Sequence, residues 1–351
     1  MAIGSVRAKD VAREAAVSVG TVSRVFNNHA NVEAGIRLRV LRAAAELGYV
    51  GPHPTRMTGA LSEVGFLFSP VNDGTAIAGN PYWSRILAGV EAEARKSRIK
   101  LVYSSVDALR HRPAELMEAV RAMKLDGALL VGPAAPEVID ALQRLTCPIV
   151  QVDDHAPGHG IDAVVTDSFE GGFQAGAYLI REGHREIACI NGPLGDGPRP
   201  RCKLYMVELR AHGYRAALLD AGLPVDHTLM ESSDLTANGG YEACRRLLAR
   251  QASFSAIFCT NDAAAIGAIR ALREAGREVP RDISVIGYGD DTYVAEHLTP
   301  ALTTIVSDTE LLGATAVKRL LARAADPTMA PTMTMLGVEL VKRESVRPRS
   351  A

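Results

Sequence analysis

The chain has 351 residues, of which 47% are hydrophobic and 23% are charged, and its formal net charge at pH 7 is -1. This composition is typical of a folded globular protein of two or three domains, and it excludes a largely disordered chain. The N-terminus lacks the apolar stretch of a secretory signal and no apolar run is long enough for a membrane helix, so we expect a cytoplasmic protein.

The charge is distributed unevenly along the chain. Residues 1–60 contain eight Lys or Arg and four Asp or Glu, a net charge of +4, so the remainder carries -5. A small basic module joined to a large acidic one indicates that the first contacts a polyanion such as DNA. A solvated helical face would explain the charge alone equally well.

Residues 8–50 show helical periodicity in three short segments. Ser18 is a suitable N-cap for the second segment, which leaves only Ala16 and Val17 to turn the chain. This spacing predicts a helix-turn-helix headpiece over residues 1–50. The predicted apolar faces of the three helices consist of Val11, Ala12 and Ala15; Val22, Val25 and Phe26; and Ile36, Val40, Ala44 and Leu47.

The outward face of the second helix carries small polar side chains and one cation. Small donors can reach phosphate oxygens, and an arginine can bridge guanine O6 and N7, so this face suits the major groove of DNA. A face that only meets solvent would usually carry several Lys and Glu. The alternative is a three-helix docking or oligomerisation module. The candidate DNA-binding residues of this helix are Val19, Gly20, Thr21, Ser23, Arg24 and Asn27.

The stretch "GPHPTRMTGALS" interrupts regular structure and predicts a linker over residues 51–61. Beyond it, apolar strand-like runs such as "VGFLFS" and "SAIFCTN" alternate with amphipathic helical segments. Such a pattern is typical of doubly wound parallel sheets covered on both faces, so residues 62–351 are predicted to form two α/β lobes with a ligand cleft between them. The expected lobes are an N-lobe of about 62–164 plus 292–325 and a C-lobe of about 165–291 plus 326–351.

Several side chains stand where the predicted strands end. Tyr82 and Trp83 open a helix after the first strand and could stack on a ligand ring, although core packing is the alternative. Asp153 ends "IVQVD" and could accept hydrogen bonds from hydroxyls, or form a turn with Asp154. Asn261 follows "AIFCT", where capping of the next helix and ligand binding need not exclude each other.

The segment "DVAREAAVSVGTVSRVFNNHANVEAGIRLRVLRAAAELGY" resembles the headpiece of the lactose and galactose repressor family of bacterial transcription regulators. Further along, "NPYW", "VVTDSFEGG", "EGHREIACINGP", "VPRDISVIGYGDD" and "LTPALTTI" also resemble family landmarks, so nearly the whole chain is covered. The resemblance implies a core of the periplasmic-binding-protein type and a homodimer that reads near-palindromic double-stranded operator DNA. It also implies a repressor controlled by a small effector in the cleft.

The resemblance assigns base contacts to Val19, Gly20 and Arg24. Since Gly20 offers no side chain, direct readout should depend mainly on Arg24. In the linker, Arg56 matches the arginine of the hinge helix found in relatives, and Met57 is the nearest candidate for the apolar wedge in the minor groove. The linker is shorter than the family pattern and contains Pro and Gly, so weaker or altered hinge folding is expected.

The resemblance also extends the effector site. Arg210, three residues before the glycine of "HGY", matches a ligand-binding arginine, and Asp290 matches an effector-binding acid, with Asp291 as its alternative. Asp73, in the loop after the first strand, is a further candidate. Acids, an amide and an arginine suit a polyhydroxylated effector such as a sugar. Arg199 and Arg201 leave a phosphate or carboxylate on that molecule open.

No cofactor, metal or catalytic activity is predicted. The chain lacks a GxxxxGK[ST] phosphate loop and a GxSxG elbow, and Pro157 and Gly158 separate His155 from His159. A solute-binding protein with a docking module that does not bind DNA is the alternative, but for transport it would need an export signal and no headpiece. The C-terminus has no leucine heptad, so a dimer is expected. Five scattered cysteines without a CxxC pair predict reduced thiols: Cys147, Cys189, Cys202, Cys244 and Cys259.

Overall fold

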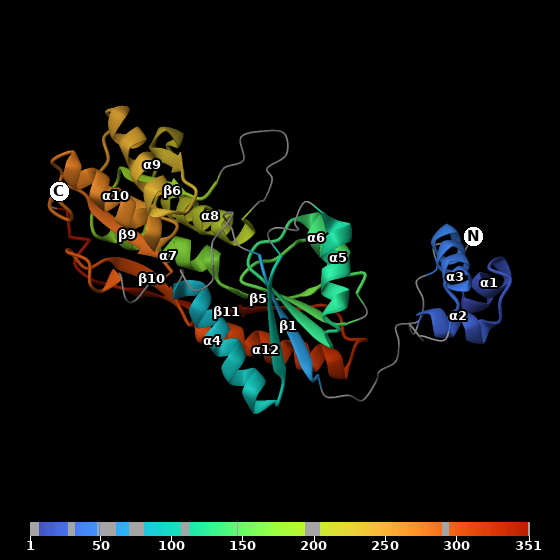
Figure 1. Ribbon diagram of the computed structural model, residues 1–351. Coiled ribbons are helices and arrows are strands. Elements are labelled where there is room, and N and C mark those ends of the chain that lie inside the picture. Colours follow the sequence, from blue (N-terminus) through green and yellow to red (C-terminus); the bar gives the residue numbers. More distant parts are fainter. Residues whose placement is uncertain are drawn as a thin grey trace. The chain divides into compact units, whose positions relative to one another are not determined.

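The computed structural model divides into two units, residues 1–60 and residues 61–351 (Figure 1). Each unit has its own hydrophobic core, so each is described by itself. The structure describes residues 7–26, 32–47, 49, 61–69, 81–106, 112–145, 147–193, 204–289 and 295–349.

The first unit contains three helices, α1 (Ala8–Glu14), α2 (Val19–Phe26) and α3 (Ala34–Leu47). The predicted apolar faces meet in one core, in which Ile36 and Leu47 are partly buried. The side chain of Phe26 lies outside the described part of the chain. The fully packed members of this core are Val11, Ala12, Ala15, Val22, Val25, Val40, Ala43 and Ala44.

The corner between α1 and α2 forms as the sequence predicts. The Ser18 side-chain oxygen accepts a hydrogen bond from the backbone N–H of Thr21 (3.0 Å), which caps the start of α2. Ala16 turns the chain with φ at 52°, in the left-handed region. At the start of α1, the Asp10 carboxylate accepts from the backbone N–H of Arg7 (2.9 Å).

The first lobe of the second unit is built on a parallel sheet with the strand order β11-β5-β4-β3-β1-β2. Phe66 and Phe68 face helices α4 (Pro81–Lys96) and α12 (Thr309–Ala325), whereas Leu67 faces α5 (Pro113–Ala122) and α6 (Pro136–Leu142) on the other side. The strands are β1 (Glu63–Phe68), β2 (Lys100–Ser105), β3 (Gly127–Val131), β4 (Ile149–Val152), β5 (Asp162–Thr166) and β11 (Met333–Leu336).

The second lobe has the strand order β12-β10-β9-β8-β6-β7, with β12 antiparallel to β10 and the other pairs parallel. Helices α7 (Ser168–Arg181) and α8 (Tyr205–Asp220) cover one face, and α9 (Ala237–Ala249) and α10 (Asp262–Glu274) cover the other. A short 3-10 helix, η3 (His227–Leu229), precedes β7. The strands are β6 (Ile187–Asn191), β7 (Met230–Ser232), β8 (Ala256–Cys259), β9 (Ser284–Tyr288), β10 (Thr303–Ser307) and β12 (Val338–Val341).

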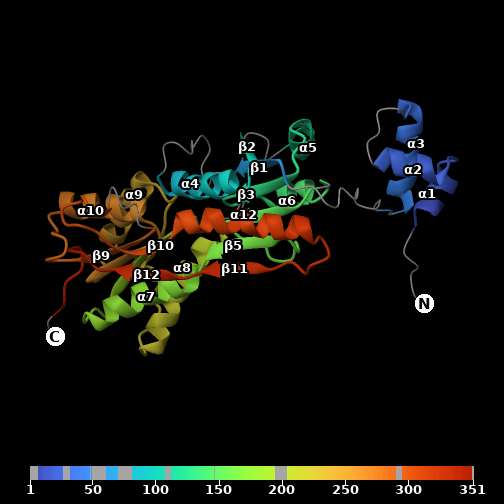
Figure 2. The same ribbon diagram turned by 90° about the horizontal axis from the view of Figure 1, so that it is seen from below.

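The chain passes between the lobes three times, from β5 to α7, from β10 to α12 and from β11 to β12 (Figure 2). The expected partition of the lobes is therefore wrong for two strands. β10, expected in the N-lobe, pairs with β9 of the second sheet, and β11, expected in the C-lobe, pairs with β5 of the first. Local hydrophobic pattern cannot assign a strand to a sheet, because long-range pairing decides it.

A buried ion cluster ties α12 to the first lobe. The carboxylate of Asp162 on β5 lies 2.7 Å from an Arg319 nitrogen and 2.6 Å from Arg323 Nε. It also accepts from the backbone N–H of Thr332 (2.8 Å), just before β11. One buried acid thus joins a helix and two strands, so we assign this cluster a structural role.

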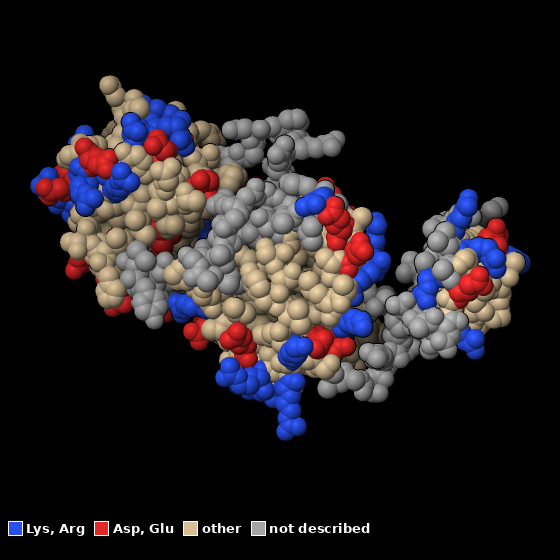
Figure 3. All heavy atoms as spheres, viewed as in Figure 1, with Lys and Arg blue, Asp and Glu red and all other residues tan. Residues whose placement is uncertain are grey.

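Charged side chains of both signs are interspersed over the visible face of the second unit (Figure 3). Within the described residues, no helix has both the length and the apolar character needed to cross a membrane.

Candidate DNA-reading helix and effector site

The outward face of α2 has the composition that the sequence predicts. Val22 and Val25 are buried in the core, while Gly20, Ser23 and Arg24 are exposed and Val19 is 49% exposed. The face therefore offers a solvent-accessible valine methyl, small polar groups and one guanidinium.

Thr21 is partly buried at the start of this helix. Its hydroxyl lies 2.9 Å from that of Ser18, so it supports the cap as well as the polar face. Three further candidates, Asn27, Arg56 and Met57, lie outside the described residues. Their DNA contacts, and the hinge that two of them would form, stay predictions.

Tyr82 and Asp153 meet at the edge of the first lobe. The Tyr82 hydroxyl, at the start of α4, donates a hydrogen bond of 2.6 Å to the carboxylate of Asp153, which follows β4. Burial raises the pKa of Asp153 to about 6, although the charge of Arg210 and the Tyr82 hydrogen bond oppose the rise. Asp153 also has φ at 63°, an uncommon backbone conformation that is concentrated at functional sites.

Arg210 extends from α8 of the second lobe and is only 7% exposed. Its guanidinium donates to the carbonyl oxygen of Thr260 (2.9 Å) and lies over the ring of Tyr288, 4.0 Å from the ring centroid. Arg210 Nε is buried without a hydrogen-bond partner in the described part of the chain. This placement differs from that of an ordinary surface helix residue and favours a ligand-binding role.

Trp83 is part of the hydrophobic core, in contrast with its expected stacking role. It is 7% exposed and packs edge-on with Phe68 (centroids 5.4 Å apart) and Tyr82 (5.2 Å). Because α4 lies on the first sheet, this position of the helix faces the strands. We therefore remove Trp83 from the ligand-facing candidates and retain Tyr82.

Asn261 caps a helix, as one of its two expected roles. Its side-chain oxygen accepts from the backbone N–H of Ala264 (3.1 Å), and its amide nitrogen donates to the carbonyl oxygen of Leu235 (2.6 Å). These bonds leave one amide N–H for a ligand. Asp73 and Asp290 lie outside the described residues, as do the alternatives Asp291, Arg199 and Arg201.

Asp154 is a residue that the sequence analysis treats only as a turn partner of Asp153. Its carboxylate is buried near the backbone of Met206, the second residue of α8, and one of its oxygens has no hydrogen-bond partner among the described residues. Burial, with smaller contributions from the charges of Asp153 and Glu208, raises the pKa of Asp154 to about 8. An acid of the first lobe therefore lies buried beside the start of a helix of the second lobe.

His155 and His159 do not form a metal site. The ring of His155 packs on Tyr205 at a centroid distance of 5.8 Å, while His159 Nδ1 lies 3.1 Å from a carboxylate oxygen of Asp140. Across the described ranges, no group of three or more His, Cys, Asp or Glu is arranged to hold a metal ion.

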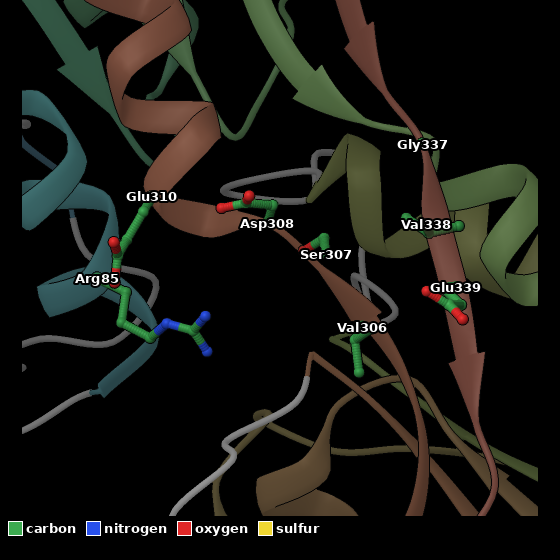
Figure 4. Close-up of a pocket in the computed structure, with 8 residues that line it drawn as sticks. All are labelled: Arg85, Val306, Ser307, Asp308, Glu310, Gly337, Val338 and Glu339. Atoms are coloured by element: carbon green, nitrogen blue, oxygen red, sulfur yellow. The ribbon is translucent and has the colours of Figure 1, made fainter. Parts of the chain in front are cut away.

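A pocket of about 600 Å³ lies where the chain passes between the lobes (Figure 4). Arg85 comes from α4 and Glu310 from α12, and the other walls come from the ends of β10 and β12. None of the predicted effector residues lines it, so we do not assign it to the effector. The lining residues are Arg85, Val306, Ser307, Asp308, Glu310, Gly337, Val338 and Glu339.

Two family models match the chain. Residues 8–51 match the model for bacterial regulatory proteins of the lacI family, and residues 177–346 match a periplasmic binding protein-like domain. The ribose operon repressor of Escherichia coli (strain K12) is 35% identical over 340 residues, which cover 96% of this chain and 98% of the repressor.

Two solved structures are similar to nearly the whole of this chain. The transcriptional regulator CelR in complex with cellobiose is 33% identical with a TM-score of 0.75, and the match covers 97% of this chain and 99% of that one. The lac repressor dimer bound to operator and the anti-inducer ONPF is 28% identical with a TM-score of 0.68, covering 98% and 100%. The chain belongs to the lacI family of bacterial regulatory proteins, and it is a DNA-binding transcriptional regulator.

Proposed function

We propose that this protein is a repressor whose affinity for operator DNA is controlled by a sugar or sugar derivative bound between the lobes. The observation that carries the proposal is the buried guanidinium of Arg210, whose Nε has no partner among the described residues and whose charge acts on Asp153 of the opposite lobe. A hydroxyl-rich ligand can accept from this N–H and donate to the carboxylate. The ribose operon repressor and the CelR–cellobiose complex support a sugar as the ligand class.

The proposed mechanism is linkage between two binding sites. A sugar that touches Asp153 and Arg210 together favours one arrangement of the lobes, and this arrangement changes the spacing of two headpieces in a homodimer. The operator-bound dimer of the lac repressor supports this assembly. We infer that the protein acts by binding alone, without catalysis, in the cytoplasm where the bacterial chromosome lies.

A thermal-shift screen tests the effector part of this proposal. The panel contains D-ribose, cellobiose, other free sugars, sugar phosphates and nucleosides. We expect at least one sugar to raise the unfolding temperature of the full chain, because a ligand that binds only the native state stabilises it. Arg210→Ala should lose this shift.

Arg215→Ala is the matched control, since Arg215 lies on the same helix and bonds to the carbonyl oxygen of Ala211 (3.2 Å). This variant should keep the parent shift. A shift that survives in Arg210→Ala would remove Arg210 from the site. Sugar binding without binding to any genomic DNA fragment would favour the alternative of a solute-binding protein.

A further inference from the structure

Arg210 is a buried cation on α8 of the second lobe. It donates to a carbonyl oxygen, and no carboxylate among the described residues lies within ion-pair distance of it. Removing a guanidinium from water is costly unless other groups stabilise its charge. Some part of the second lobe must therefore hold this side chain in place.

Tyr288 supplies the required surface. It ends β9, is 1% exposed, and presents its ring to the guanidinium carbon of Arg210 at 4.0 Å from the centroid. The face of an aromatic ring carries negative charge density, and its attraction for a cation is strongest where water is excluded. The ring stabilises the charge without accepting a hydrogen bond in its plane, and Arg210 Nε has no acceptor within the part of the chain that the structure describes.

Two consecutive glycines of α7 leave the space that the Tyr288 ring and the Arg210 backbone occupy. A Cβ atom at Gly171 would lie 2.6 Å from Tyr288 Cε2 and 2.8 Å from its hydroxyl oxygen, so only glycine leaves room for the ring. At Gly172, a Cβ atom would overlap the backbone carbonyl of Arg210. Gly171 thus allows the close approach of the Tyr288 ring, and Gly172 allows the close approach of the Arg210 backbone.

We propose that Tyr288 is a positioning residue of the effector site, whose ring holds the Arg210 guanidinium so that its Nε–H points to the ligand. The inference rests on the proposed function, in which Arg210 contacts the sugar. Tyr288 acts through Arg210 and is not itself assigned a contact with the sugar. In the sequence, the only signal for this role of Tyr288 is its place as an aromatic residue at the end of a buried strand.

The first test needs no effector. In the full chain, the Arg210 Nε–H resonance is assigned by its loss in Arg210→Lys, and its proton shift is compared among variants by NMR. A proton above an aromatic ring is shifted to low frequency. We expect Tyr288→Phe to keep the parent shift. Tyr288→Met, which fills similar space without a ring, should move the resonance to higher frequency and expose it to faster exchange with water.

The second test uses the sugar that gives the largest thermal shift. We expect Tyr288→Met to weaken its binding roughly tenfold or more, while Tyr288→Phe stays within about threefold of the parent. Gly171→Ala should also weaken sugar binding, because its methyl group would displace the Tyr288 ring. This variant leaves both Arg210 and Tyr288 unchanged. Tyr241→Leu, which removes a tyrosine under the exposed Arg270 (4.6 Å), is the control and should bind as the parent does.

Two results would overturn the inference: an unchanged Arg210 resonance in Tyr288→Met, or equal loss of binding in Tyr288→Phe and Tyr288→Met. If Tyr288→Met does not fold, the same two measurements are made on Gly171→Ala. An unchanged Arg210 Nε–H resonance and an unchanged sugar affinity in that variant would then overturn the inference. If no sugar binds the parent protein, the proposed function fails, and the resonance of Arg210 still decides the role of Tyr288.

Discussion

Arg24 is the charged residue on the outward face of α2, whose other members are small, aliphatic or hydroxylated. Since Gly20 contributes no side chain, hydrogen bonding to base edges on this face depends on one guanidinium and a few hydroxyls. An arginine that bridges guanine O6 and N7 contributes both affinity and discrimination. The loss of Arg24 should therefore affect preferred and random DNA unequally.

We expect Arg24→Ala to weaken operator binding by about 1 to 3 kcal/mol while random DNA loses less, so that the ratio of the two affinities falls. Fluorescence anisotropy with both DNAs measures this ratio. Arg13→Ala is the control, because the Arg13 side chain is 82% exposed on α1 and carries the same charge. An unchanged ratio in Arg24→Ala would show that α2 does not read the bases.

Burial divides the candidate site residues into those that the sequence could predict and those that it could not. Arg210 was found from its register with a known family, and Asp153 from its place at the end of a strand. The core position of Trp83 and the role of Tyr288 depend on which neighbours fold against them. The Arg210–Tyr288 contact is long-range, and the packing of Trp83 on Phe68 depends on how α4 lies on the sheet, so no local pattern contains either.

At the scale of elements, the contact between β4 and α8 joins the two lobes. Asp154 follows β4 and lies near Met206 at the start of α8, while Met206 packs on Ala163 and Val165 of β5. Asp153, Glu208 and His155 are the titratable groups around this carboxyl group. Burial between the lobes raises the pKa of Asp154, so its buried position favours the protonated acid.

The contribution of Asp154 to stability should depend on pH. Burial raises its pKa from 3.8 to about 8, so between these values the native state binds a proton that the unfolded chain has released. The free energy of unfolding therefore declines as the pH rises through this window. We expect Asp154→Asn to lack the decline and to gain about 1 to 3 kcal/mol over the parent between about pH 5 and about pH 8.

Urea unfolding at a series of pH values measures this difference. Asp220→Asn is the control, since Asp220 is exposed at the other end of α8, and it should follow the parent profile. Parallel pH profiles for the parent and Asp154→Asn would show that Asp154 is ionised in the native protein.

The sequence predicts individual helices and strands better than it predicts how the strands assemble into two sheets. The helical corner followed from Ser18 and from the spacing of the apolar residues, because capping and periodicity are local properties. The assignment of β10 and β11 to lobes failed because no local pattern marks where the chain crosses between the lobes. β10 stays with β9, the strand before it, whereas β11 pairs with β5, far back in the chain. The topology of the crossings therefore had to come from the structure.

At the scale of the whole molecule, a headpiece with its own core is joined to a two-lobed unit that contains the candidate effector site. Membership of the lacI family defines the class of regulator, and the buried Arg210 and Asp153 support the class of ligand. Linkage requires that the sugar bind the two states with different affinities, and typical couplings change affinity 5- to 150-fold, or about 1 to 3 kcal/mol.

The most direct test titrates the full chain against promoter fragments from its source genome, with and without the sugar that gives the largest thermal shift. The account predicts that at least one fragment binds roughly a thousandfold more tightly than random DNA, and that the sugar changes this affinity by about fivefold or more. If no fragment is preferred over random DNA, or if the preferred fragment binds equally well with every sugar in the panel, the account is contradicted.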